Sequence, residues 1–267
     1  MKKQLKNTLV YSALVMAGIG SQVQAAGATF IPSAGLTFKN AEYSTKLSST
    51  ASADVSEGDY VTLNLSLTAA FDTFYATLLL EQGLTEGDFS EQGGGDITND
   101  GVTFTVGCNC IDSVKDLSLF AGVNTIEATI NSGLDDGDSA TNLKEVAEDS
   151  GLFFGASYPL VSNQNGRLTA TLAYAALDGE TKVTSDSFVG TLGTDTIIIK
   201  GDTTGLSYGI AWAGQLSETL DYSVSYKIQD YSTDADTISF GTTTGSLSDV
   251  ELDRKFGMLS AQVTSYF

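Results

Sequence analysis

The chain ends in the stretch Arg254–Phe267, RKFGMLSAQVTSYF, whose side chains alternate between two faces. Leu259, Ala261, Val263 and Ser265 share one face with the terminal aromatic residue, and mostly polar residues take the other. A period of two is typical of a β-strand, because successive side chains point to opposite sides of the sheet. We therefore expect a strand at the very end of the chain that finishes on an aromatic residue.

The same alternation is clearest in the segment 60–71 and in the segment 74–81, which a tight turn at Asp72-Thr73 joins. In the first segment Val61, Leu63 and Leu65 lie on one face, and Thr62 and its polar neighbours on the other. The polar face carries small hydroxyl and amide groups and not the Lys and Glu of a solvent-facing strand. This composition favours a strand between an apolar exterior and a polar interior.

Turn residues divide the chain into further alternating segments. The predicted strands are 33–48, 60–71, 74–81, 101–107, 116–130, 152–160, 167–177, 205–213, 220–230 and 254–267. The connections alternate between short ones (72–73, 108–115, 161–166, 214–219) and long ones (49–58, 84–100, 132–150, 178–203, 231–253). We expect an all-β fold, a closed antiparallel up-and-down transmembrane β-barrel of about ten strands, with eight or twelve left open.

Some local details of this pattern are also predictions. The apolar phase shifts at Thr125-Ile126, which indicates either a bulge or the membrane boundary. The segment 145–148 is expected to form at most a helical turn. Aromatic residues near predicted strand ends are expected to form interface girdles; they are Tyr60, Tyr158, Tyr174, Tyr208, Trp212 and Phe267.

The first residues have the organisation of a secretory signal peptide. Lys2, Lys3 and Lys6 precede a short apolar core, and Val23-Gln24-Ala25 resembles a cleavage site of small residues. We expect residues 1–25 to be removed and residues 26–267 to form a single barrel domain.

The terminal Phe267, with the alternating strand before it, resembles the closing strand of Gram-negative outer-membrane β-barrels, of the small OmpA/OmpX-like or porin-like kind. The resemblance implies that Phe267 helps to close the barrel and that the barrel assembly machinery inserts it. It also implies export through the periplasm to the cell outer membrane, with outer-membrane lipid and lipopolysaccharide as partners. No oligomeric state follows from it.

Composition excludes several functions. A net charge of −20 argues against nucleic acid as a partner. The chain has no histidine, which removes most zinc sites and Ser-His-Asp hydrolysis. The omptin proteases resemble this chain in strand number, but their site needs a histidine. We therefore expect no enzyme activity and no cofactor, apart from a divalent cation such as Ca²⁺.

The predicted lumen is lined by small residues with four charges, Lys39, Glu81, Asp221 and Lys227. Small side chains favour a narrow passive channel, a porin-like protein, since ten strands lie between closed eight-stranded barrels and wide porins. Most of the 33 acidic residues fall in the five long connections, so such a channel should prefer cations. The alternative is a closed structural barrel whose acidic extracellular loops bind surface partners or divalent cations.

Two small clusters are candidate sites. Asp135, Asp136 and Asp138 offer the oxygen ligands that Ca²⁺ prefers, although their spacing is not that of an EF-hand. Cys108 and Cys110 lie in a predicted periplasmic turn, where the oxidising compartment permits a disulfide. An intermolecular bridge or a metal site is the alternative for these cysteines.

Overall fold

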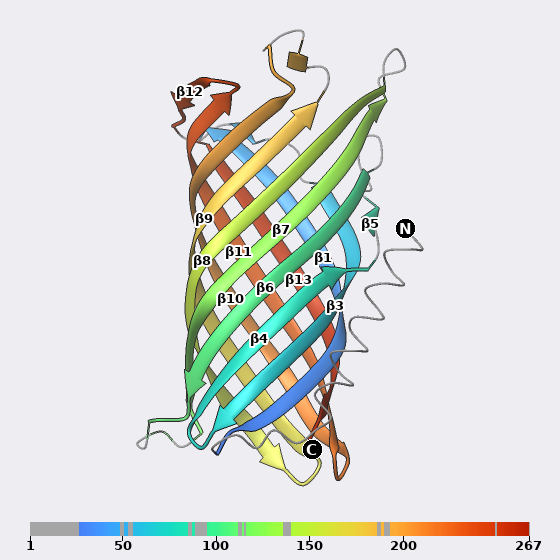
Figure 1. The fold of residues 1–267 in the computed structure, drawn as a ribbon, viewed down its shortest axis with the longest axis vertical. Helices are drawn as coiled ribbons and strands as arrows, with labels where there is room; N and C mark the ends of the chain where they lie inside the picture. Colours follow the sequence, from blue (N-terminus) through green and yellow to red (C-terminus); the bar gives the residue numbers. More distant parts are fainter. Residues whose placement is uncertain are drawn as a thin grey trace.

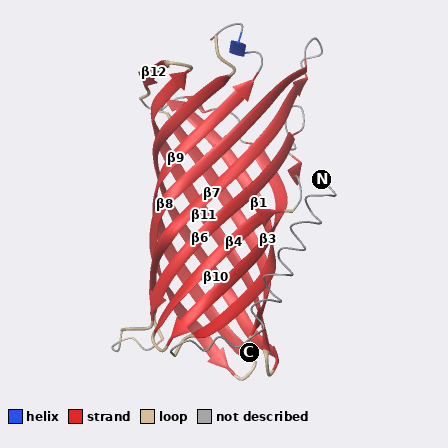
Figure 2. Ribbon diagram, in the orientation of Figure 1, coloured by secondary structure: helices blue, strands red, loops and turns tan. Residues whose placement is uncertain are grey.

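The computed structural model describes residues 27–48, 51–52, 56–84, 87–88, 95–111, 114, 116–135, 140–185, 188–189, 193–248 and 250–266. Ten strands of this part form a closed antiparallel barrel (Figure 1, Figure 2). They are β1 (Thr29–Ser48), β3 (Ser56–Phe71), β4 (Phe74–Gly83), β6 (Gly95–Cys108), β7 (Ser118–Asp135), β8 (Ala140–Asn163), β9 (Gly166–Ser185), β10 (Thr196–Ser217), β11 (Leu220–Phe240) and β13 (Glu251–Ser265). Three short strands, β2 (Ala51–Ser52), β5 (Gly87–Asp88) and β12 (Thr243–Ser246), pair with the outer parts of β1, β6 and β11.

The last strand closes the barrel, as the sequence predicts. One edge of β13 pairs with β11, and its other edge pairs with β1 from Ser33↔Thr264 to Lys46↔Glu251. Closure gives the backbone N–H and C=O groups at every strand edge a hydrogen-bonding partner, which lipid cannot provide. Phe267 itself lies outside the described residues, but the amide of Tyr266 donates a 2.9 Å hydrogen bond to the carbonyl of Thr219.

The short connections gather at one end of the barrel, at the bottom of Figure 1. Tight turns join β3 to β4, β8 to β9, and β10 to β11. The connection after β6 carries a disulfide between Cys108 and Cys110, with Cα atoms 5.2 Å apart. In the topology that the resemblance implies, this end faces the periplasm.

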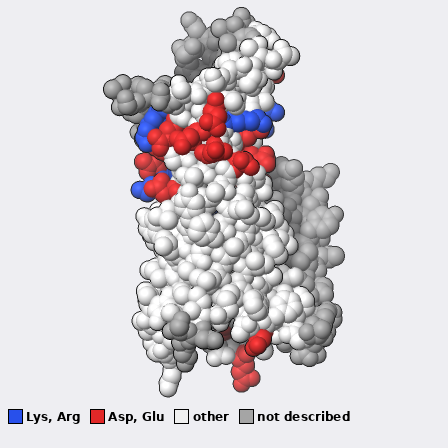
Figure 3. Space-filling model, turned by 90° about the vertical axis from the view of Figure 1, so that its left-hand side faces the viewer, with Lys and Arg blue, Asp and Glu red and all other residues white. Residues whose placement is uncertain are grey.

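The outer surface of the barrel carries an apolar belt. Leu36, Phe104, Leu152, Phe154 and Ile210 are all exposed on it, Leu152 to 65%. Such exposure would be costly in water and is favourable against lipid tails. Figure 3 shows this belt as a broad uncharged zone, with most of the charged residues of this face above it and a few acidic ones below it.

The strands continue above the belt, well beyond their predicted ends. The register across Thr125-Ile126 is regular on both sides of β7, so the phase shift marks the membrane boundary and not a bulge. Below it the apolar side chains face lipid; above it the outward positions are polar or charged, as at Glu127, and the apolar ones face inward, as at Ala128. At this level the apolar face of the barrel wall therefore changes from the outer side to the inner side.

Two local predictions are wrong. The segment 145–148 belongs to β8 and not to a helical turn. Tyr60 is not a girdle residue: it points into the barrel and is 1% exposed. Among the described residues, no helix is long and apolar enough to cross a membrane.

Candidate functional site: the lumen and the outer collar

Large side chains from many strands meet inside the upper half of the barrel. We call this group the closing cluster: Ala41, Tyr60, Ile97, Ala175, Leu177, Tyr231, Phe256 and Met258, with Tyr43, Ile130 and Phe153 packed against it. The ring of Phe256 contacts Tyr43 and Tyr231 edge-on, with centroids 6.0 and 6.3 Å apart. Because its members come from most of the strands around the barrel, the cluster fills the lumen at this level.

An ion pair crosses the lumen within this cluster. Arg254 on β13 and Asp149 on β8 form two parallel hydrogen bonds, one of them 2.7 Å from Nη2 to Oδ1. Each residue is only 7% exposed. Thr233 accepts a 2.8 Å bond from Arg254, and Thr203 donates a 3.1 Å bond to Asp149. These bonds supply most of the partners that a buried charge pair requires, although Nε of Arg254 has none among the described residues.

A second charged group lies just below. Lys39 forms an ion pair with Glu81 and donates a 2.8 Å hydrogen bond to Asn99 Oδ1. Its ammonium lies 5.8 Å from the centre of the Tyr60 ring, within reach of a cation–π interaction. The two predicted lumen charges Lys39 and Glu81 therefore neutralise each other.

Below the closing cluster the lumen widens into a cavity of about 320 Å³, which we call the chamber. Its polar lining includes Thr37, Asn64, Ser207, Ser225, Ser260 and Gln262. Leu79 and Met258 add apolar surface, and Glu81 and Lys227 are the charged residues that line it within the described part of the chain. The chamber lies at the level of the apolar belt, inside the membrane-spanning part.

The structure brings three of the four predicted lumen charges together and places Asp221 apart from them. Lys227 lies in one row with Met258 and Lys39 across β11, β13 and β1, and its side chain is exposed to the chamber. Asp221 is six positions further along β11 toward the short turns, opposite Thr264. At about 3.3 Å per residue this is roughly 20 Å from Lys227.

The outer surface just above the belt carries a collar of charged residues. Figure 3 shows red and blue side chains across one face of the barrel at this level. On β8 to β11 they border a groove of about 420 Å³, whose carboxylates are Glu148, Asp178, Glu180, Asp202 and Asp236. Several of these carboxylates fall in connections that the sequence predicts as loops, and the structure places them on strands.

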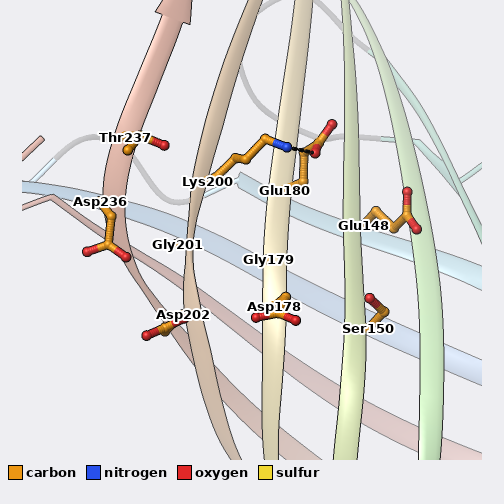
Figure 4. A pocket seen from close by; sticks show the side chains of 10 residues that line it. All are labelled: Glu148, Ser150, Asp178, Gly179, Glu180, Lys200, Gly201, Asp202, Asp236 and Thr237. Carbon is orange, nitrogen blue, oxygen red and sulfur yellow. Dashed lines mark ion pairs between the residues drawn. The ribbon is translucent and has the colours of Figure 1, made fainter. Parts of the chain in front are cut away.

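One lysine lies among these five carboxylates. Lys200 forms a 2.6 Å ion pair with Glu180, as Figure 4 shows, and this hydrogen bond raises the pKa of Lys200 above its ordinary value. The other four carboxylates point into or along the groove from fixed strand positions (Figure 4). The groove therefore keeps a strongly negative character.

The predicted metal ligands are not placed by the structure. Asp136 and Asp138 lie outside the described residues, as does the side chain of Asp135. Within the described residues, no group of three or more Asp, Glu or Cys side chains is arranged to hold a metal ion by itself.

No protein-family model matches the sequence, and no curated protein sequence is similar to it. The fold is similar to that of the outer membrane protease OmpT from Escherichia coli, with a TM-score of 0.66 and 8% identity over 92% of this chain and 99% of that one. A weaker similarity, TM-score 0.47 and 12% identity, joins 99% of this chain to 96% of the translocator domain of the autotransporter NalP from Neisseria meningitidis. The first similarity shows that the chain has the fold of outer-membrane β-barrels.

Proposed function

We propose that this protein is an outer-membrane barrel whose lumen is closed to passive diffusion and which acts through its extracellular collar. The observation that carries the proposal is the Arg254–Asp149 pair, held across the lumen by two parallel hydrogen bonds inside an aromatic cluster. A lumen that opened by thermal motion would have to separate two buried charges, which is costly. The closed barrel is therefore favoured over the permanently open cation channel.

The collar is suited to bind divalent cations that bridge the barrel to lipopolysaccharide phosphates. Its carboxylates lie directly above the apolar belt, where the headgroups of the outer leaflet would be. Carboxylates held close together on a rigid surface repel one another and repel the phosphates of anionic lipid, so they need a counter-ion there. Ca²⁺ takes six to eight oxygen ligands, so the groove would supply some and the phosphates the rest. A cation shared in this way does not need a complete set of ligands from the protein.

The experiment compares two sets of three neutralised acids. One variant carries Asp178→Asn, Asp202→Asn and Asp236→Asn in the groove; the control carries Asp72→Asn, Asp116→Asn and Glu218→Gln in the short turns. Each barrel is placed in vesicles that contain lipopolysaccharide, and the temperature of heat-modifiable migration is measured with and without Ca²⁺. We expect Ca²⁺ to raise the melting temperature of the wild type and of the control, and much less that of the groove variant. An equal response of all three proteins would contradict the role of the collar.

Closure is tested separately. Purified wild-type protein in planar bilayers should show no steady single-channel conductance, whereas a porin-like channel would conduct at once. Asp135, Asp136 and Asp138 remain candidate ligands of a second cation site, and a variant with all three neutralised can be added to the Ca²⁺ comparison.

A gated channel is the second candidate, because the chamber gives part of the lumen a polar, accessible lining. Such a channel would open only when the closing cluster rearranges, and it would retain a cation preference from the collar. Protease activity is a property of OmpT; the absence of histidine from this sequence favours a protein that is not an enzyme.

A further inference from the structure

We propose that the chamber is a binding site for a small carboxylate with a short apolar body, held by Lys227. This site is distinct from the collar, since it lies inside the barrel below the closing cluster.

The chamber holds one uncompensated positive charge. Glu81 is neutralised by Lys39, which leaves Lys227 as the remaining charge that lines the cavity. Among the described residues, no carboxylate lies within ion-pair distance of Lys227, although Lys46, Lys200 and Arg254 each have such a partner. A bound anion would give this ammonium group the counter-charge that it lacks.

The groups around Lys227 suit the oxygen atoms of one carboxylate. Ser207 and Ser225 line the chamber beside it, and hydroxyl groups donate to anions as readily as they accept. Across the chamber, Asn64 donates to Thr37 while its buried side-chain oxygen has no partner among the described residues. That oxygen is free to accept from a donor, for example a hydroxyl group or a water molecule held beside the ligand.

The remaining lining selects the body of the ligand. Leu79 and Met258 present apolar surface to the same cavity. The volume of about 320 Å³ is at the lower end of the range for small-molecule sites and exceeds what a single inorganic anion needs. One positive charge next to a short apolar wall matches a monocarboxylate with a few carbon atoms. The closing cluster covers the outer side, so such a ligand would arrive from the end of the short turns.

The test measures the affinity of the refolded barrel in detergent for butyrate and for butyramide, its uncharged amide, by titration calorimetry without divalent cations. We expect butyrate to bind at least about tenfold more tightly than butyramide. Lys227→Gln should lower the affinity for butyrate by about tenfold and remove this preference, and Lys227→Arg should retain it. The control, Lys255→Gln, changes an outward lysine of β13 and should have no effect. Heat-modifiable migration confirms that each variant is folded.

A second variant examines the apolar wall. Leu79→Ser should weaken the binding of butyrate and leave that of acetate unchanged, because only butyrate reaches the removed surface. Equal binding of butyrate and butyramide to the wild type, no binding of either, or full binding to Lys227→Gln would each overturn the proposal. Failure of the collar experiment would leave this proposal standing, since the two measurements share neither site nor ligand.

Discussion

Arg254 and Asp149 lie on strands separated by three others around the barrel, yet their side chains meet in its centre through two parallel hydrogen bonds. Both are buried, and Thr203 and Thr233, whose hydroxyl oxygens are 2.7 Å apart, hydrogen-bond to the pair. This arrangement ties opposite walls together above the membrane-spanning part. In the closed barrel proposed above, closure would therefore depend on the strands and not on the connections between them.

Breaking this pair should destabilise the barrel strongly. Asp149→Leu leaves Arg254 buried without its counter-charge, which costs about 3–5 kcal/mol of unfolding free energy. Removing both charges with Asp149→Leu and Arg254→Met should cost much less, since no unpaired charge remains. Urea unfolding in detergent measures the difference. The control is Lys46→Gln, which breaks an exposed pair with Asp253 and should change the stability little. Equal losses for Asp149→Leu and Lys46→Gln would contradict the burial of the Arg254–Asp149 pair.

The closing cluster depends on a close approach at Gly205. A Cβ atom added there would lie 2.0 Å from Cδ1 of Tyr231, so the ring packs where a side chain would otherwise be. Gly205→Ala should therefore displace the Tyr231 ring and destabilise the barrel by about 1–3 kcal/mol.

The double variant Gly205→Ala with Tyr231→Ala separates this clash from a general effect of alanine in a strand. It should lose less stability than the two single changes add up to, because the added methyl group then enters the space of the removed ring. Additive losses in the same urea titration would show that the two residues do not compete for this space.

Glu145 makes the stability of the barrel depend on pH. It faces inward on β8, above the apolar belt, and burial raises the pKa of its carboxyl group above the ordinary value. Between the unfolded and the folded pKa the native state binds more protons, so stability falls as the pH rises through this window. Glu145→Gln removes the effect and should stabilise the barrel at neutral pH more than at pH 4. The melting temperatures of the wild type and of Glu145→Gln at neutral pH and at pH 4 check this. If the two proteins differed by the same amount at both pH values, the prediction would be wrong.

The sequence predicts the transmembrane half of the molecule well. All ten strands, the tight turn at Asp72-Thr73 and closure by the last strand follow from alternation with the apolar side outward, as in the segment 60–71. The physical reason is that lipid selects an apolar outer face over the whole height of the belt.

The half of the barrel above the apolar belt is predicted poorly, because the rule inverts there. Tyr231 and Thr233 face inward and Asp230 and Asp234 outward, so alternation continues with the opposite polarity, and the segment 231–253 reads as an acidic loop. Ile97 and Tyr231 of the closing cluster, and Asp149, the partner of Arg254, fall in such segments and were missed for this reason. A search for alternation of either polarity would have extended β11 to its observed end.

The ion preference of an opened barrel can be predicted from the same charges. Tyr231→Ala with Phe256→Ala removes two rings from the closing cluster, and we expect this variant to conduct where the wild type does not. The collar and the acidic connections surround its outer mouth and should concentrate cations. The preference should fade between 0.1 M and 1 M salt, as the Debye length falls from about 10 Å to about 3 Å.

Lys227 opposes this cation preference from within the chamber, so adding Lys227→Gln should raise cation selectivity, whereas adding Asp178→Asn and Asp202→Asn should lower it. Reversal potentials across a salt gradient measure both shifts. Anion preference of the opened variant, or a fall in cation selectivity on adding Lys227→Gln, would contradict this distribution of charge.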